Sequence, residues 1–562
     1  MIRKLLLKAF KIEAARFAAA FDRLTKEPLR TQEEVLLRKV RRNENTLFGR
    51  EHGFGKIAGI ADFRRNVRIC HYDEFAPYVK RIVGGERNVL FSETDRLLMF
   101  ALTSGTTVEP KYIPVTESFL SEYRRGWMIW VSHVMKKYPG FLDRKILPIA
   151  SPTCEHVSHQ GIRCRVPCGS MSGLSMERQR LAPRLLYAVP TQSYHVKDEL
   201  AKYYTVMRLA IEHSITTVMS PNPSTHIAVA RVVDEFRESI IRDVRDGTIS
   251  SSFELPGNIR GDLSRFLKPN PGRARELEAI VDRSGKLMPK DYWSDIVLLA
   301  CWKGGAVHHF LDLLPKYYPE VPAYEMGLIA SEGRVSIPVS DEGRAGVLDI
   351  GSHFFEFIPE EQEESPDPDA YLSHELEVGG RYFVVMTTSS GLCRYNLHDL
   401  IEVVGFYNAT PVVAFLNKGK HISSMTGEKV SEYQIVSAVH RCASRFAVGP
   451  CVFTLVPTWN EVPYYRLLIE EEDLGDGASC GEFIRAIDME LMKLNMEYDG
   501  KRRSGRLGGM RLAVIRAGSF GEVRQRKVIY GGVSPEQYKH CYLVPDGDYG
   551  DRFTVLREVC FE

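Results

Sequence analysis

Buried strands alternate with amphipathic helices from residue 97 to residue 358 of the sequence. The first strand is the apolar run Leu97–Leu102, and a helix with Thr116 as its cap is expected over 116–137. Further expected elements are a strand near 215–220, helices near 223–243 and 305–314, and a strand near 354–358. This alternation predicts an α/β sheet rather than a sandwich.

The chain changes character after residue 360. A polar stretch at 360–369 is typical of a solvated surface loop. A β-rich part and then an α+β pattern follow, with strands near 381–388, 400–406, 412–415, 451–456, 464–470 and 511–515 and helices near 430–443 and 480–497. The sequence therefore predicts a large N-terminal α/β domain over 1–417 and a small C-terminal α+β domain over 418–562.

The composition argues against two classes of partner. Lys and Arg total 74 against 72 Asp and Glu, a net charge of +2, so no basic excess is available for a nucleic acid. No run of about eighteen apolar residues is present, so we expect no membrane span. Eleven cysteines without a paired CxxC framework indicate reduced thiols and a cytoplasmic protein.

The loop after the first buried strand carries the sharpest chemical signal. Thr103–Thr107 is a run of small and hydroxyl residues, and Lys111 follows shortly after it. Backbone N–H groups in such a loop can hold phosphate oxygens, the hydroxyls add donors, and the lysine supplies a positive charge. The same residue types also form ordinary turns. The loop is not a Walker A motif, because GxxxxGK[ST] occurs nowhere in the chain.

Two acidic residues lie next to apolar segments. Glu332, in Ala330–Gly333, follows an apolar run, and a carboxylate in this position could hold Mg²⁺ on phosphates. Asp399, in Gly391–Leu400, begins an apolar strand and could accept both hydroxyls of a ribose. The alternatives are a surface glutamate and a turn aspartate. Two more segments, Thr426–Glu432 and Gln537–Lys539, stand out in the C-terminal part.

These five segments, in this order and at these separations, resemble the auxin-responsive acyl acid-amido synthetases, the Gretchen Hagen 3 family. The chain looks like a bacterial-type member of this family, which belongs to the wider adenylate-forming enzymes. The resemblance covers residues from about 30 to 545 and includes the segments 45–54, 71–78, 81–86, 170–173, 221–224, 354–359 and 405–406.

The resemblance implies a large N-terminal α/β domain and a small mobile C-terminal domain. It also implies that the protein uses ATP and Mg²⁺ to convert a small-molecule carboxylic acid to an acyl-adenylate with release of pyrophosphate. An amine, usually an amino acid in plant members, then displaces AMP and forms an amide.

The resemblance further implies roles for individual residues. Ser104, Gly105, Thr106 and Thr107 would hold phosphate beside Lys111, and Ser331 and Glu332 would hold the nucleotide and the metal. Asp399 would fix the ribose, Lys418 would lie at the hinge, and Lys539 would stabilise the α-phosphate during adenylation. Thr116, Ser172 and Gly173 would lie at the substrate site.

Four positions depart from the family pattern. Val108 replaces a glycine common in the phosphate loop, Leu328 falls where a tyrosine often lies beside adenine, and His398 replaces the glycine before the ribose aspartate. Lys418 replaces an arginine. Two alternatives therefore remain open: a ligase or acyltransferase that delivers the acyl group to a thiol or hydroxyl, and a nucleotide-binding homologue without turnover.

Overall fold

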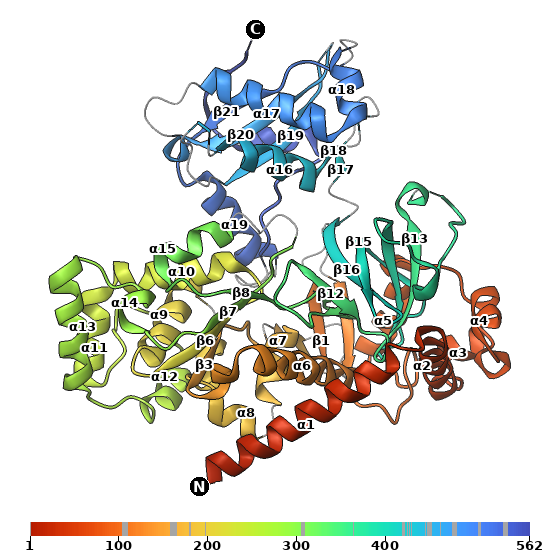
Figure 1. Ribbon diagram of the computed structural model, residues 1–562, viewed down its shortest axis with the longest axis horizontal. Coiled ribbons are helices and arrows are strands. Elements are labelled where there is room, and N and C mark those ends of the chain that lie inside the picture. Colours follow the sequence, from red (N-terminus) through yellow and green to blue (C-terminus); the bar gives the residue numbers. More distant parts are fainter. Residues whose placement is uncertain are drawn as a thin grey trace.

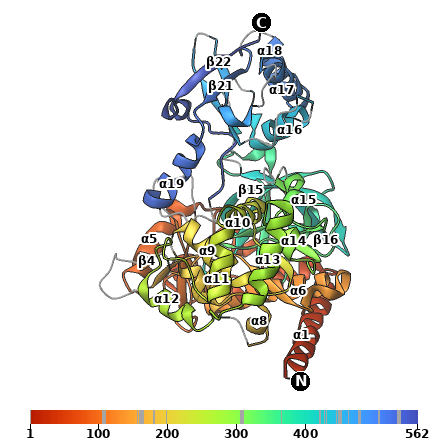
Figure 2. The same ribbon diagram turned by 90° about the vertical axis from the view of Figure 1, so that its left-hand side faces the viewer.

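The computed structural model describes all residues except 1, 104–110, 155, 158–165, 179–180, 197, 305–309, 364, 419–421, 424, 426–427, 429, 444, 447–451, 461, 475–479, 504–506, 532–537 and 562. A broad lower part carries a smaller C-terminal domain on top of it (Figure 1). The side view in Figure 2 shows the same separation. The predicted α/β class, with a large N-terminal domain and a C-terminal domain, is confirmed.

The first buried strand and the helix after it form as predicted. Strand β1 (Leu97–Thr103) pairs antiparallel with β2 (Lys111–Thr116) and parallel with β5 (Pro167–Gly169), which pairs with β4 (His156–Val157). Helix α6 (Glu117–Lys137) begins where the Phe119 N–H donates to Thr116 Oγ1 at 3.3 Å. The other helices of the chain up to residue 186 are α1 (Ile2–Leu24), α2 (Pro28–Arg42), α3 (Leu47–Glu51), α4 (Ile60–Asn66), α5 (Tyr72–Val83), α7 (Met171–Glu177) and α8 (Leu181–Leu186).

A second sheet of the large domain is fully parallel. Its strands, in spatial order, are β3 (Lys145–Pro148), β6 (Ile215–Met219), β7 (Leu298–Cys301) and β8 (Ala323–Glu325). The accompanying helices are α9 (Glu199–Ala210), α10 (Pro223–Glu235), α11 (Arg237–Asp246), α12 (Gly257–Ser264), α13 (Pro271–Ser284), α14 (Pro289–Tyr292) and α15 (Leu314–Tyr317). The helix predicted near 305–314 falls largely on residues outside the described ones.

The third sheet of the large domain has six antiparallel strands. Their spatial order is β11 (Ser336–Ile337), β12 (Ala345–Leu348), β16 (Thr410–Lys418), β15 (Tyr395–Tyr407), β14 (Arg381–Thr387) and β13 (Phe354–Pro359). A two-stranded hairpin, β9 (Ile329–Ala330) and β10 (Gly333–Arg334), lies between β8 and β11 in the chain. The strands predicted near 354–358, 381–388, 400–406 and 412–415 are therefore confirmed.

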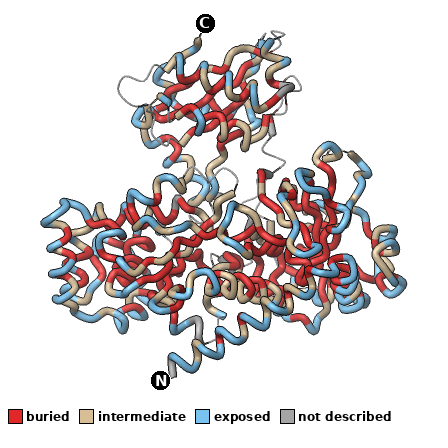
Figure 3. The backbone as a smooth tube through the Cα atoms, viewed as in Figure 1, coloured by how far each residue is buried: buried red, intermediate tan, exposed pale blue. Residues whose placement is uncertain are grey.

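The C-terminal domain has its own sheet and its own core. The sheet order is β19 (Phe453–Thr458), β20 (Tyr464–Glu470), β21 (Arg511–Ile515) and β22 (Val555–Val559), and β20 and β21 are parallel. Its other elements are β17 (Ile422–Ser423), β18 (Val430–Ser431), α16 (Glu432–Ala443), α17 (Cys480–Leu494), α18 (Met496–Arg503) and α19 (Ser519–Gly531). Buried residues concentrate inside this domain, apart from those of the lower part (Figure 3).

Polar and aromatic side chains connect the two domains. The His440 Nε2 atom on α16 lies 3.1 Å from Asp312 Oδ2, and an Arg344 N–H donates to the Tyr433 hydroxyl at 3.4 Å. Separating domains joined by polar contacts costs less free energy than separating a large buried apolar interface. Relative motion is therefore common between domains connected in this way. Among the described residues, none of the helices has the length and apolar character needed to cross a membrane.

Candidate nucleotide site

Glu332 and Asp399 both act electrostatically on Tyr395. Glu332 occupies the turn between β9 and β10, next to Ser331, and is 7% exposed, whereas Asp399 lies in β15 and is 2% exposed. The side chain of Tyr395, also on β15, hydrogen-bonds Glu332. Burial raises the pKa of Tyr395 far above the ordinary phenol range, and the negative charges of Glu332 and Asp399 raise it further. Two carboxylates predicted from separate segments therefore share one neighbour.

Lys111 and Tyr72 extend this cluster toward the predicted phosphate loop. The Lys111 ammonium lies 5.5 Å from the ring centroid of Tyr72, and the Tyr112 N–H donates to the Tyr72 hydroxyl at 2.8 Å. Burial raises the pKa of Tyr72 to about 12, and the charge of Glu332 acts in the same direction. Tyr72 therefore contacts the cation at the start of β2 and also experiences the charge of the carboxylate in the β9–β10 turn.

The phosphate loop itself lies outside the described residues. This applies to Ser104, Gly105, Thr106 and Thr107, and to Val108. The two strand ends that the loop joins are described, because Thr103 and Lys111 are directly paired across β1 and β2. Both ends of the predicted loop are therefore held by the pairing of β1 with β2. One of them, Lys111, contacts the ring of Tyr72.

His398 keeps a backbone conformation that favours glycine. Its φ angle is +56°, and its N–H donates to Asn396 Oδ1 at 2.8 Å. The ring stacks on His71 at 4.9 Å between centroids, and His71 Nδ1 lies 3.0 Å from His398 Nε2. The bulky side chain thus lies against the beginning of α5, and the backbone next to Asp399 stays left-handed at a cost of about 1–2 kcal/mol.

Asp399 also lies in the last residue pair between strands β15 and β16. Its Cα partner on β16 is Lys418, the residue predicted to lie at the hinge. The predicted ribose ligand therefore lies opposite the last residue of β16. Farther along the chain, Glu428 is fully buried and accepts hydrogen bonds from the Met425 N–H and the Tyr465 hydroxyl, at 2.7 and 2.6 Å.

Lys539 reaches the large domain from the C-terminal domain. It is exposed, and its ammonium lies 4.5 Å from the ring centroid of Trp302. Trp302 directly follows β7 and donates its indole N–H to the carbonyl of Gly327, at 2.9 Å. Gly327 comes just before Leu328, a half-buried residue whose N–H donates to Ser336 Oγ at 3.1 Å. Trp302 therefore contacts both Lys539 and the segment that leads into Glu332.

The three residues expected at the substrate site have different environments. Thr116 is fully buried and caps α6. Gly173 is buried, and a Cβ atom there would lie 2.5 Å from the carbonyl oxygen of Ser151, so this glycine permits close packing of two segments. Ser172 is half-buried, and its hydroxyl lies 2.8 Å from Ser170 Oγ. Of the three, only Ser172 has a partly exposed side chain.

Sequence reasoning missed four aromatic residues of this region: His71, Tyr72, Tyr395 and Trp302. His71 and Tyr72 belong to a segment that matches the family pattern. The match marked this segment, but it assigned no function to the two residues. Trp302 directly follows a buried parallel strand, and residues at the carboxyl ends of such strands often line ligand sites. That position alone could have marked it as a candidate.

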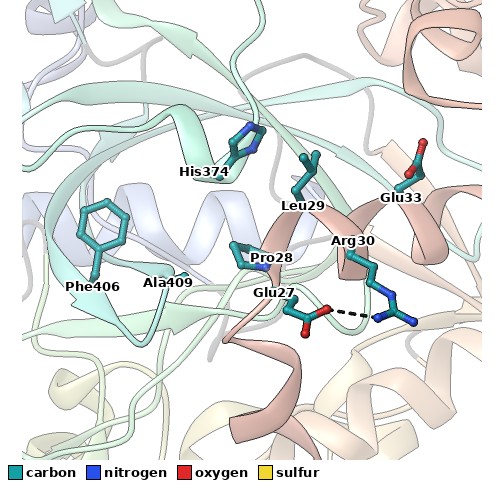
Figure 4. A pocket seen from close by; sticks show the side chains of 8 residues that line it. All are labelled: Glu27, Pro28, Leu29, Arg30, Glu33, His374, Phe406 and Ala409. Carbon is teal, nitrogen blue, oxygen red and sulfur yellow. Dashed lines mark hydrogen bonds and ion pairs between the residues drawn. The ribbon is translucent and has the colours of Figure 1, made fainter.

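A surface hollow elsewhere on the large domain contains none of the predicted residues. It lies between the start of α2 and the β15–β16 hairpin, and its lining residues are Glu27, Pro28, Leu29, Arg30, Glu33, His374, Phe406 and Ala409 (Figure 4). The nucleotide cluster is therefore distinct from this hollow.

The side chains of Glu332, Asp399 and Lys111 have the chemistry needed to bind a nucleotide together with its metal. Mg²⁺ on a nucleotide needs one or two protein carboxylates, because phosphate oxygens and water complete its shell. Glu332 meets this requirement, while Asp399 offers acceptors and Lys111 a positive charge. No group of three or more His, Cys, Asp and Glu residues arranged for a metal occurs in the described part of the chain. These residues thus fit a metal carried on phosphates.

The fold is that of an acyl acid amido synthetase. The solved structure of GH3.15 acyl acid amido synthetase matches with a TM-score of 0.82 and 20% identity, covering 96% of each chain. A structure of AtGH3.15 acyl acid amido synthetase in complex with 2,4-DB gives a TM-score of 0.83 and 19% identity, covering 98% of this chain and 97% of that one.

The protein belongs to the GH3 family, as its sequence predicts. The family's N-terminal, central and C-terminal domain models match residues 17–323, 346–418 and 433–548. Jasmonoyl–L-amino acid synthetase GH3.5 of Oryza sativa subsp. japonica is 24% identical over 550 residues, which are 91% of this chain and 92% of the relative. Indole-3-acetic acid-amido synthetase GH3.3 of Arabidopsis thaliana is 22% identical over 554 residues, with 94% and 91% covered.

Proposed function

We propose that this protein is an ATP-dependent acyl acid-amido synthetase that joins a small-molecule carboxylic acid to an amine, with an amino acid as the expected acceptor. The observation that carries the proposal is the cluster of Glu332, Asp399 and Lys111 around Tyr72 and Tyr395. Three segments far apart in the chain supply an acceptor for a ribose, a ligand for Mg²⁺ and a cation for phosphate at one place.

The chemistry proceeds in two steps. A carboxylate oxygen of the acid attacks the α-phosphorus of ATP, a new O–P bond forms, and the bond to the β-phosphate breaks to release pyrophosphate. The amine then attacks the acyl carbon, AMP departs, and the amine nitrogen loses a proton. Mg²⁺ bound to the phosphates would neutralise part of the charge that hinders the first attack.

The residues of this chain have separate tasks in the first step. Asp399 holds the ribose and Glu332 carries the metal, so the nucleotide is oriented before the acid arrives. Ser331 and the loop residues Ser104–Thr107 hold the nucleotide and its phosphates. Lys539 donates to the α-phosphate oxygens as negative charge grows on them, which lowers the barrier through charge stabilisation.

The remaining expectations belong to the same proposal. The boundary between the domains lies at Lys418, a placement supported by the end of the β15–β16 ladder at that residue. Ser172 and Gly173 lie near the acceptor amine. The protein acts in the cytoplasm on small molecules, and nucleic acid is not among its partners.

The test is release of pyrophosphate from ATP across a panel of aryl, indolyl and fatty acids, with and without pooled amino acids. Acid-dependent release that particular amino acids stimulate is the expected result. Acid-dependent release that amino acids leave unchanged would replace the amine with a thiol or hydroxyl acceptor. ATP binding without release for any acid would contradict the proposal and favour a homologue without turnover.

A further inference from the structure

Trp302 is held rigidly at the carboxyl end of the parallel sheet. Its backbone N–H donates to the Pro221 carbonyl at 2.8 Å, and its indole N–H donates to the Gly327 carbonyl at 2.9 Å. Gly327 has φ +86°, and a Cβ atom there would lie 2.3 Å from the Ser336 carbonyl oxygen, so this segment is closely packed. The indole ring is therefore fixed between β7 and the hairpin that carries Glu332.

The backbone around Lys539 is held just as firmly, but by the C-terminal domain. His540 Nε2 lies 2.8 Å from the Phe453 carbonyl oxygen, and the Tyr542 N–H donates to Glu432 Oε2 at 3.0 Å. The Leu455 N–H donates to the Tyr542 carbonyl at 2.8 Å, which attaches this segment to β19. The position of Lys539 thus reports the orientation of the whole C-terminal domain.

The contact between these two rigid parts is one of a cation with an aromatic face. The Lys539 ammonium lies 4.5 Å from the centre of the Trp302 ring, well inside the range of about 6 Å in which the ring attracts a cation. An indole face attracts the ammonium without neutralising its positive charge. A carboxylate at the same place would cancel the charge that the first step requires.

We propose that Trp302 is a positioning residue that receives the Lys539 ammonium and sets the C-terminal domain in the orientation used for adenylation. This inference rests on the proposed function and names the surface on which the catalytic lysine works. The strength of such a contact corresponds to a preference of about 3- to 30-fold for the docked position. A contact of this size orients the domain and still allows the domain to leave for the second step.

The first experiment measures the contact without any turnover. Lysines of the substrate-free protein are labelled with an N-hydroxysuccinimide ester, and the rate at Lys539 is compared by mass spectrometry with the rate at Lys290, an exposed lysine of α14. Because the ring stabilises the charged ammonium, we expect Trp302→Leu to raise the relative rate at Lys539 at least about threefold and Trp302→Phe to raise it less. An unchanged rate in Trp302→Leu overturns the proposal.

Fluorinated tryptophan placed at position 302 alone gives a variant of unchanged shape. Added fluorine withdraws charge from the ring face, so the relative labelling rate at Lys539 should rise with each fluorine. This series decides the matter even where Trp302→Leu fails to fold. A rate independent of fluorination overturns the proposal.

The second experiment separates the two half-reactions. Trp302→Leu should lower kcat for acid-dependent pyrophosphate exchange about tenfold, change the KM for ATP by less than about twofold, and leave aminolysis of supplied acyl-adenylate unaffected. In a Lys539→Ala background the same substitution should have no further effect, since its partner is gone. A full effect in that background would mean that Trp302 acts on folding and would overturn the proposal.

The two experiments also distinguish this inference from the proposed function. In one outcome, the wild-type protein shows no pyrophosphate exchange for any acid tested, but the labelling rate at Lys539 still changes when Trp302 is substituted. This outcome would support the contact between Lys539 and Trp302 and contradict the synthetase assignment. In the other outcome, the protein exchanges pyrophosphate, but the labelling rate at Lys539 is the same whichever residue occupies position 302. This outcome would support the synthetase assignment and reject the role of Trp302.

Discussion

Asp399 and Lys539 carry the opposite charges that the proposed adenylation needs, and the chain supports them in different ways. Asp399 is 2% exposed within a long strand of a six-stranded sheet, whereas Lys539 is exposed and belongs to a segment outside any helix or strand. Its backbone is fixed by the C-terminal domain, and its side chain contacts the large domain through Trp302. In the proposed reaction, the sheet would hold Asp399 in place before the nucleotide binds, whereas the position of Lys539 would depend on the orientation of the C-terminal domain.

The largest effect is expected from removal of the delivered cation. Lys539→Ala should lower acid-dependent pyrophosphate exchange by about 10²- to 10³-fold, because charge stabilisation at the α-phosphate is lost in the transition state. ATP affinity, measured by calorimetry, should change less than about threefold. Lys290→Ala serves as the matched surface control. Equal losses in exchange and in affinity would show that Lys539 binds ATP in the ground state.

The carboxylate of the β9–β10 turn should rank next. Glu332→Gln keeps the size of the side chain and removes its charge, so exchange should fall by about 10²-fold and respond only weakly to added Mg²⁺. The measurement is the rate of acid-dependent pyrophosphate exchange at a series of Mg²⁺ concentrations. Full exchange at every concentration would place the metal elsewhere.

Asp399→Asn should act on binding and only weakly on the chemical step. The loss of a charged acceptor for the ribose is expected to weaken ATP about tenfold, or about 1.4 kcal/mol, within the usual range for hydrogen bonds to charged groups. Calorimetric titration with ATP provides the value, and Asp367→Asn on the exposed loop is the control. An unchanged affinity would mean that the ribose lies against another group.

His540, which helps to hold the backbone next to Lys539, should make the stability of the folded protein depend on pH. Burial lowers the pKa of His540 from 6.5 to about 4, so the folded protein keeps this imidazole neutral where the unfolded chain already binds a proton. Stability should therefore fall as the pH drops from 6.5 toward 4, by at most about 1.4 kcal/mol per pH unit.

His540→Gln keeps a donor near the Phe453 carbonyl and removes the titration. Its unfolding free energy, followed by urea denaturation of the full chain between pH 5 and 7 (a window set by the ordinary His pKa of about 6.5), should vary less than that of the wild type. A slope equal to the wild-type slope would assign the acid sensitivity to other groups.

The smallest effect is expected beside Asp399. His398→Ala and His398→Gly both lose the contact with His71, so their difference isolates the backbone. With φ at +56°, the glycine variant should be more stable than the alanine variant by about 1 kcal/mol in urea denaturation. Equal stabilities would mean that this turn relaxes once the imidazole is removed.

The sequence predicted those parts of the site that depend on local patterns. The apolar run before the phosphate loop and the cap at Thr116 are local signals, and both elements form. The pairing of His71 with His398 joins residues 327 positions apart, and the contact of Lys539 with Trp302 crosses two domains. Contacts of this kind depend on tertiary packing, so neither periodicity nor a short motif could predict them.

The separate core of the C-terminal domain has a consequence for how such proteins diversify. Among the residues that the structure describes, its main hydrophobic cluster is formed by residues from Met425 to Phe561. Substitutions that reshape an acid-binding surface in the large domain therefore leave this cluster packed and the backbone around Lys539 in place. If the proposed function holds, selection can alter the choice of acid in the large domain while the C-terminal domain continues to supply the same lysine to each new substrate.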